Sequence, residues 1–153
     1  MAQEIERKFL VNIDKLPTLP IGDIIKQGYI PTEGITVRIR IRNTLAYLTI
    51  KGKANGLSRL EFEYPIPLMD AQQILTELCS HPLIEKTRYL IAYEKHTWEL
   101  DIFDGDNRGL IVAEIELKNE NESFKKPKWI KEEVSYDKRY RNSELLKTPF
   151  NTW

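Results

Sequence analysis

Hydrophobic and polar residues alternate along most of this chain. Eight segments show the period-two pattern that is typical of strands, because successive side chains of a strand point to opposite faces of a sheet. They cover residues 2–10, 24–31, 35–43, 45–53, 58–66, 84–93, 97–104 and 110–117. Turn dipeptides separate several of them, namely Glu33-Gly34, Asn55-Gly56 and Asp104-Gly105. The pattern predicts a mainly β fold with a few helices, an eight-stranded antiparallel sheet closed into a barrel.

Helical periodicity is confined to short segments. Asp70 and Gln73 stand at the spacing of a capping box, and an apolar stripe follows them, so a helix is expected from Asp70 onward. Residues 119–126 predict a second, short helix ended by a proline, and residues 143–147 a third one capped by Ser143. No repeat or linker divides the chain, so residues 1–153 are expected to form one domain.

Composition narrows the class of protein. Hydrophobic residues make up 41% of the 153 residues and charged residues 30%, and no run approaches the roughly 20 apolar residues that span a bilayer. Basic and acidic residues both number 23, which argues against a bulk electrostatic nucleic-acid binder. Cys79 is the only cysteine, and the N-terminus is charged from Glu4 onward. We therefore expect a cytoplasmic protein without disulfides.

Like charges recur on one face of strand after strand. Residues two apart share a face, and most of the eight segments carry pairs of one sign there. The acidic pairs are Glu61 with Glu63, Glu99 with Asp101, and Glu114 with Glu116. The basic sets are Arg38 with Arg40 and Arg42, Lys51 with Lys53, and Lys86 with Arg88, while the first segment combines Glu4, Glu6 and Lys8. Paired carboxylates suggest ligation of a divalent metal, and paired bases suggest binding of phosphate oxygens.

The alternation leaves two arrangements open. The apolar faces could fill the barrel and leave the charges in water, as in an ordinary sheet. In the inverse arrangement the charges line the lumen, and helices cover the apolar faces from outside. A charged interior is costly unless it is wet and its charges are paired, so this arrangement is expected only for a functional site. We favour the inverse arrangement because of the resemblance that follows.

The segment Glu4-Ile5-Glu6-Arg7-Lys8 matches the ExExK signature of the CYTH domain superfamily, the triphosphate tunnel metalloenzymes. The similarity continues in order through Val37-Arg38-Ile39-Arg40, Thr49-Ile50-Lys51-Gly52, Arg59-Leu60-Glu61-Phe62-Glu63, Glu85-Lys86-Thr87-Arg88-Tyr89, Glu99-Leu100-Asp101, Ala113-Glu114-Ile115-Glu116 and Asp137-Lys138-Arg139-Tyr140-Arg141-Asn142. The chain most resembles the short bacterial inorganic triphosphatases. This resemblance implies a tunnel whose lumen carries the charges, and hydrolysis or cyclisation of triphosphates with Mg²⁺ or Mn²⁺.

The resemblance also assigns roles position by position. The first-strand and last-strand metal ligands correspond to Glu4, Glu6 and Glu116. Further tunnel acids, for a second ion or for metal-bound water, correspond to Glu114, Glu61, Glu63 and Asp101. The bases that grip the triphosphate correspond to Lys8, Arg38, Arg40, Lys51, Lys86 and Arg88.

Two hypotheses describe how water is activated. In the first, a carboxylate organises the water through the metal. In the second, Lys86 is a general base, because neighbouring arginines would lower its pKa, and Tyr29 is its candidate partner. The alternative interpretation of Tyr29 is an aromatic side chain that packs the barrel. His81 and His96 are expected to be structural, Trp98 and Trp129 to cover the barrel, and Cys79 to be a small buried hydrophobe.

The expected reaction is metal-dependent hydrolysis of a small triphosphate, inorganic tripolyphosphate above all, to pyrophosphate and orthophosphate. Within the superfamily the alternatives are an adenylyl cyclase and a thiamine triphosphatase. Outside enzymes, they are a polyphosphate-binding sensor and a nucleic-acid-binding barrel that uses Arg38, Arg40 and Arg42. The acidic faces count against the last, and we expect neither a nucleic-acid nor a membrane partner. No GxxxxGKS or GxxxxGKT loop is present, so a P-loop enzyme is excluded.

Overall fold

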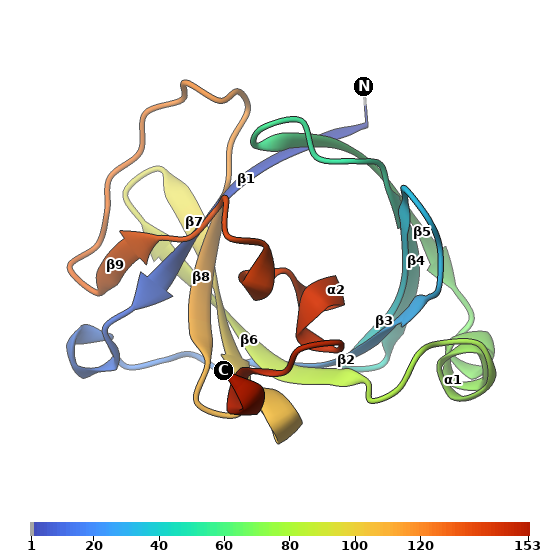
Figure 1. Cartoon of the computed structure of the whole chain (residues 1–153). Coiled ribbons are helices and arrows are strands. Elements are labelled where there is room, and N and C mark those ends of the chain that lie inside the picture. The colour runs from blue at the N-terminus through green and yellow to red at the C-terminus, as the bar shows by residue number, and fades with distance from the viewer. Residues whose placement is uncertain (1) are drawn as a thin grey trace.

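The computed structural model describes residues 2–153 and is rich in strands (Figure 1). The strands are β1 (Gln3–Val11), β2 (Asp23–Ile30), β3 (Thr36–Arg42), β4 (Leu45–Lys51), β5 (Ser58–Ile66), β6 (Ile84–Tyr93), β7 (His96–Phe103), β8 (Ile111–Glu116) and β9 (Ile130–Glu133). The α-helices are α1 (Leu68–Glu77) and α2 (Asn142–Leu145), and short 3-10 helices cover Ile13–Lys15, Gly105–Asn107, Lys138–Tyr140 and Phe150–Thr152. Among the described residues, no helix has the length and apolar character needed to cross a membrane.

Strands β1 to β8 close into an antiparallel barrel. The pairing order is β5-β4-β3-β2-β6-β7-β8-β1, and β1 returns to pair with β5. The first part of β1 pairs with β5, where Glu4 lies opposite Arg59, and its second part pairs with β8, where Lys8 lies opposite Glu114. The predicted fold is therefore confirmed, and the predicted strands agree with the observed ones within two residues at each end. The four-residue strand β9, which the alternation did not predict, adds to the end of β1.

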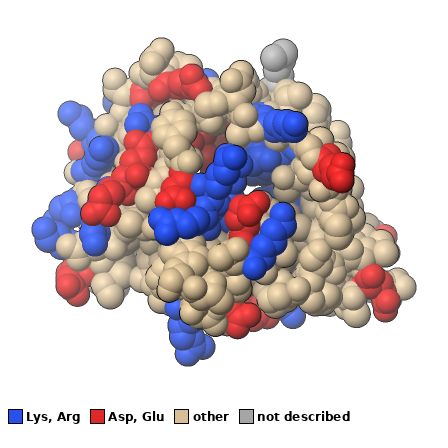
Figure 2. Space-filling model, viewed as in Figure 1, with Lys and Arg blue, Asp and Glu red and all other residues tan. Residues whose placement is uncertain are grey.

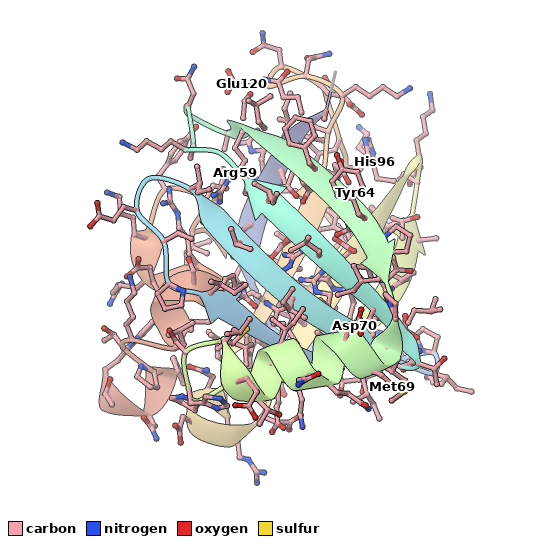
Figure 3. All side chains as sticks on the ribbon, turned by 90° about the vertical axis from the view of Figure 1, so that its right-hand side faces the viewer. Arg59, Tyr64, Met69, Asp70, His96 and Glu120 are labelled. Carbon is pink, nitrogen blue, oxygen red and sulfur yellow. The ribbon has the colours of Figure 1, made fainter. Side chains whose placement is uncertain are left out.

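Helix α1 covers the outer faces of β2, β3 and β4 (Figure 3). Its Ala71 and Leu75 pack against Ile39 of β3 in a buried cluster. The helix comes close enough to Gly28 of β2 that a Cβ there would lie 3.0 Å from the Leu75 side chain. The expected cap is wrong: the helix begins at Leu68 after Pro67, which makes no side-chain cap hydrogen bond, and Asp70 lies in the first turn.

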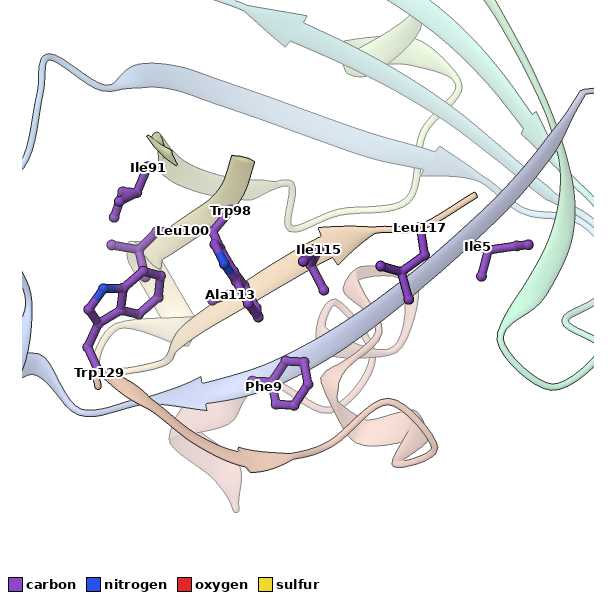
Figure 4. Close-up of a cluster of buried hydrophobic side chains, with 9 residues drawn as sticks. All are labelled: Ile5, Phe9, Ile91, Trp98, Leu100, Ala113, Ile115, Leu117 and Trp129. Atoms are coloured by element: carbon purple, nitrogen blue, oxygen red, sulfur yellow. The ribbon is translucent and has the colours of Figure 1, made fainter. Parts of the chain in front are cut away.

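A second apolar cluster covers the outer faces of β1, β7 and β8 (Figure 4). Phe9 and Trp98 are fully buried there with Trp129 against them, which confirms that both tryptophans cover the barrel. The predicted helix over residues 119–126 is wrong, since only a turn is present. The Glu122 carboxylate accepts hydrogen bonds from the Lys118 amide and His96, and the Phe124 ring packs on Phe9 and Trp98. These tertiary contacts hold the segment in a non-helical conformation.

The C-terminal segment crosses one end of the barrel, and α2 lies inside the ring of strands in Figure 1. Leu145 is fully buried at this end, in one cluster with Tyr29, Phe103 and Tyr140. The predicted last helix is present, but it begins at Asn142, after Arg141, and not after Ser143. The segment therefore brings polar side chains from residues 141–143 to the lumen.

Candidate active site

The charged faces of the strands line the lumen, as the inverse arrangement predicts. Seen along the barrel, acidic and basic side chains gather around the central hollow (Figure 2). A cavity of about 80 Å³ lies there, and all six bases expected to grip a triphosphate line it. The cavity is lined by Glu6, Lys8, Tyr29, Thr36, Arg38, Arg40, Lys51, Arg59, Lys86, Arg88, Glu114, Arg141, Asn142 and Ser143. Strand parity thus brings together side chains that lie far apart in the sequence.

Acidic side chains gather where β1 pairs with β8. Glu6 lies opposite Glu116 in the strand register, and Glu114 lies two pairs further along, on the same face of β8. Burial, together with the charges of Glu114 and Glu4, holds the pKa of Glu6 well above its usual value. Burial and Glu4 likewise raise the pKa of Glu116. Carboxylates whose pKa values rise together lie close enough to repel one another.

Several other acids of the lumen lie next to bases. Lys51 Nζ lies 3.0 Å from Glu4 Oε1 and 3.3 Å from Glu61 Oε2, so Glu61 lies beside the acidic cluster. Lys8 Nζ lies 3.4 Å from Glu114. Although burial alone would raise the pKa of Glu114, the charges of Lys8 and Arg88 hold it well below its usual value. The nearby bases thus favour the charged form of Glu114, whereas burial disfavours the charged form of its neighbour Glu6.

Two of the expected tunnel acids lie apart from this cluster. Asp101 is fully buried and accepts a two-pronged pair of hydrogen bonds from Arg88, at 2.8 and 2.9 Å. Its Oδ2 atom also lies 2.7 Å from Lys86 Nζ. Glu63 accepts hydrogen bonds from Arg38 and Thr49. The structure thus places Asp101 and Glu63 among the bases, with oxygens already bonded to them.

The acidic cluster has carboxylates of the kind that hold a metal ion, but they are not grouped around one point. Among residues 2–153, no three acidic, histidine or cysteine side chains stand close enough to hold an ion as they are. The donors nevertheless suit a hard divalent cation, because all of them are carboxylate oxygens. Glu4, Glu6 and Glu116 also have raised pKa values, for which a nearby positive charge would compensate. The donor chemistry of these residues therefore fits such an ion, although their side chains would have to move closer together to hold it.

Arg38 and Arg40 are buried neighbours on the lumen face of β3. Arg38 is 6% exposed, and its Nε atom is buried without a hydrogen-bond partner in the described part of the chain. Arg40 donates to the Gln27 side chain at 2.7 Å. Burial lowers the pKa of Arg40 to about 9, and the charges of Arg38 and Arg88 contribute to this. The positive charges of Arg38 and Arg88 therefore repel that of Arg40.

Lys86 is the most buried base, with 2% of its surface exposed. Its Nζ atom lies 2.7 Å from Asp101 Oδ2 and donates a hydrogen bond of 2.8 Å to Asn142 Oδ1. Burial lowers the pKa of Lys86 to about 7, with Arg88 and Arg40 adding to the effect and Asp101 opposing it. The sequence-based hypothesis attributes this shift to arginines, whereas burial is the larger cause here. Tyr29, its candidate partner, accepts a hydrogen bond from Gln27.

Several lumen residues were missed by sequence reasoning. Arg59 lies on the same face of β5 as Glu61, so strand parity alone could have found it. Arg42, which the sequence analysis placed on one face with Arg38 and Arg40, does not line the cavity and pairs instead with Asp23 at 2.7 Å. Arg141 and Asn142 come from the C-terminal segment, and no strand pattern marks them. Only their place in the Asp137–Asn142 motif was a signal.

Among sequence models of known protein families, the model of the CYTH domain matches residues 2–149. The chain belongs to the CYTH domain family. It is 49% identical over 154 residues to the inorganic triphosphatase of Acetivibrio thermocellus, covering 100% of this chain and 99% of that protein. It is 37% identical over 151 residues to the inorganic triphosphatase of Nitrosomonas europaea, covering 93% and 95%.

Solved structures agree with this membership. The crystal structure of an inorganic triphosphatase superposes on this CYTH domain with a TM-score of 0.68 and 32% sequence identity, over 95% of each chain. A protein of Pyrococcus horikoshii shares the fold at 19% identity, with a TM-score of 0.59 over 77% of this chain and 80% of that one. The ExExK residues of this CYTH domain, Glu4, Glu6 and Lys8, lie together on the lumen side of β1.

Proposed function

We propose that this CYTH domain is a triphosphatase that cleaves inorganic tripolyphosphate to pyrophosphate and orthophosphate. Its relatives at 49% and 37% identity carry the name inorganic triphosphatase. The observation that carries the proposal is Arg38, whose buried Nε atom has no partner among residues 2–153 and stands in a lumen crowded with bases. A buried donor without an acceptor is costly, and a phosphate oxygen would supply that acceptor. The single cysteine suits a reducing compartment, so we place the reaction in the cytoplasm.

The lining of the cavity supports a small inorganic substrate. Tripolyphosphate carries several negative charges, and arginine and lysine neutralise such charges while they fix the orientation of the chain. Apart from Tyr29, the side chains around the 80 Å³ cavity are charged or polar. A nucleobase would need an apolar or stacking surface, and this lining offers little of it. The lumen therefore favours tripolyphosphate over ATP.

We include Mg²⁺ or Mn²⁺ in the proposal. Glu4, Glu6, Glu114 and Glu116 would hold the ion, with Glu61 beside them. When bound, such an ion neutralises phosphate charge and withdraws electron density from the phosphorus. The carboxylates and the bases of the lumen then have separate tasks, because the bases bind the triphosphate directly.

Lys86 and Tyr29 are proposed as the groups nearest the chemistry. Water attacks the terminal phosphorus, the bridging P–O bond breaks, and pyrophosphate leaves with the electron pair of that bond. Lys86, with a pKa of about 7, accepts the proton that the water loses. Its Nζ atom donates a hydrogen bond to Asn142 and forms an ion pair with Asp101, and Lys86 lines the cavity. Tyr29 lines the same cavity and can donate its hydroxyl hydrogen to a phosphate oxygen.

The test is release of phosphate from tripolyphosphate, ATP and thiamine triphosphate, with Mg²⁺ or Mn²⁺ and with EDTA. We expect orthophosphate from tripolyphosphate first of all, and none in EDTA. Arg38→Ala should raise KM for tripolyphosphate at least about tenfold, since a charge-assisted contact contributes about 1.5–3 kcal/mol. Arg7→Ala is the matched control, because Arg7 pairs with Glu133 outside the lumen. Tight binding without release from any triphosphate would replace the enzyme by a sensor.

A further inference from the structure

Two neutral amides lie among the charges of the lumen. Asn142, the first residue of α2, accepts hydrogen bonds at its Oδ1 atom from Lys86 Nζ at 2.8 Å and from Gln27 Nε2 at 3.1 Å. Gln27 of β2 is fully buried, and its Nε2 atom also donates to the Tyr29 hydroxyl at 2.9 Å. Its Oε1 atom accepts from Arg40 Nε at 2.7 Å. Two amides thus connect three functional side chains from three different strands.

The chemistry of the partners fixes the orientation of both amides. Arginine has only donors, so the oxygen of Gln27 must face Arg40 and its nitrogen must point to Tyr29 and Asn142. Lysine in its charged form also has only donors, so the oxygen of Asn142 must face Lys86. Reversing either amide would place two donors against each other. The bridge Lys86–Asn142–Gln27–Tyr29 therefore has a single hydrogen-bonding pattern, with Arg40 held at its centre.

A neutral amide suits this position better than an acid. A carboxylate at position 142 would add charge beside Asp101, which is already bonded to Lys86 and Arg88. It would also pull Lys86 toward the C-terminal segment. The amide oxygen binds the ammonium group without a net charge, so Lys86 is held between Asn142 and Asp101 while it lines the cavity.

The segment that carries Asn142 is anchored on both sides. Before it, the Tyr140 carbonyl accepts a hydrogen bond from Lys8 Nζ at 2.9 Å, and the Tyr140 ring packs edge-on against Trp153. After it, Leu145 is fully buried in the apolar end of the barrel. These contacts hold the backbone at position 142, so the amide is presented to Lys86 from a fixed point.

We propose that Asn142 and Gln27 are positioning residues that fix Lys86 and Tyr29 for attack on the triphosphate. The inference rests on the proposed function, because it assigns the two amides to that reaction. Binding of the substrate depends mainly on the bases themselves. Loss of the bridge should therefore lower kcat far more than it raises KM, which a merely structural role would not do.

The experiment compares Asn142→Ala with Asn142→Asp, which keeps an oxygen at the Oδ1 position. We expect Asn142→Ala to lower kcat with tripolyphosphate about 10- to 100-fold, the range found when the groups that orient metal ligands are removed, with KM within about threefold. Asn142→Asp should recover part of that loss, because it keeps an acceptor for Lys86 but adds a charge beside Asp101. Glu144→Ala on the same helix, whose partner is Lys147 at 3.8 Å, should leave kcat unchanged. An unchanged kcat in Asn142→Ala, or equal losses in all three variants, would overturn the proposal.

A second measurement does not depend on activity. An ammonium group held by two acceptors exchanges its protons slowly, so Lys86 should give a side-chain ¹⁵N–¹H signal in the NMR spectrum below pH 7. Asn142→Ala should broaden or shift this signal, and Asn142→Asp should keep it. If the wild-type protein hydrolyses no triphosphate but the signal responds in this way, the proposed function is wrong and the bridge still holds Lys86. An identical signal in Asn142→Ala would show that Asn142 does not position Lys86.

Discussion

The Lys86→Met variant should show how far the buried lysine lowers the free energy of unfolding of this protein. Methionine has nearly the length of lysine, no charge and no hydrogen to donate. Asp101 keeps the two hydrogen bonds from Arg88 in this variant, so its charge stays compensated. The substitution therefore removes a buried ammonium group without leaving a buried carboxylate unpaired.

The size of the effect follows from the pKa of Lys86. Burial lowers it from 10.5 to about 7, so protonated Lys86 opposes folding. At about 1.4 kcal/mol for each pKa unit, the charged form costs between 4 and 5 kcal/mol, roughly, below pH 7. The folded state binds fewer protons than the unfolded state between pH 7 and 10.5, so the free energy of unfolding rises with pH across this window. Between pH 7 and pH 9 the wild type should gain about 2 kcal/mol relative to Lys86→Met.

Urea unfolding at pH 7, 8 and 9 measures this difference. We expect Lys86→Met to be the more stable protein at pH 7 and its advantage to shrink by pH 9, while its rate of tripolyphosphate hydrolysis falls by at least two orders of magnitude, roughly, as for loss of a general base. Lys26→Met is the matched control on the outer wall, where Lys26 is half exposed and 3.8 Å from Glu85. A stability difference between wild type and Lys86→Met that stays constant from pH 7 to 9 would refute the reasoning.

Two further substitutions test the acidic cluster and the outer core. Glu6→Gln should lower the rate of phosphate release about 100-fold or more through weaker metal binding. Its melting temperature at pH 8 should be equal to that of the wild type or higher, because the substitution relieves repulsion with Glu114 and Glu4. A normal dependence of the rate on Mg²⁺ would contradict this. Trp98→Ala should lower the free energy of unfolding by about 3–5 kcal/mol, since the side chain is fully buried between Phe9 and Trp129; denaturant unfolding measures it, and a loss under about 1 kcal/mol would count against a packed outer core.

The barrel and most of its lumen were predictable because a strand has a period of two. Once Glu4 and Glu6 were assigned to one face, the parity of β1 also fixed Lys8 on that face, and the same held for Arg38 with Arg40 on β3. The alternation does not indicate which face of the sheet points into the barrel. That choice depended on the family resemblance, because an ordinary sheet has the same alternation with its charges in water.

Residues that act through tertiary contacts could not be predicted in this way. Gln27 lies on the lumen side of β2, but an isolated glutamine in a strand carries no signal of its own. Asn142 lies in a four-residue helix whose place in the barrel depends on the burial of Leu145 more than 100 residues from Gln27. The loop after β8 shows the reverse case, because the local pattern of residues 119–126 indicated a helix and the packing of Phe124 overrode it.

The distribution of charge in the lumen is itself an argument for its function. A lumen built only for stability would place each acid beside a base, as Asp101 and Arg88 are placed. Instead, burial and neighbouring acids raise the pKa of Glu6 and Glu116, beside β1 and β8. Across the lumen, burial and the charges of Arg38 and Arg88 lower the pKa of Arg40. The acids repel one another, and so do the bases. A divalent cation on the acidic side and a polyanion on the basic side are the two ligands that would compensate these charges.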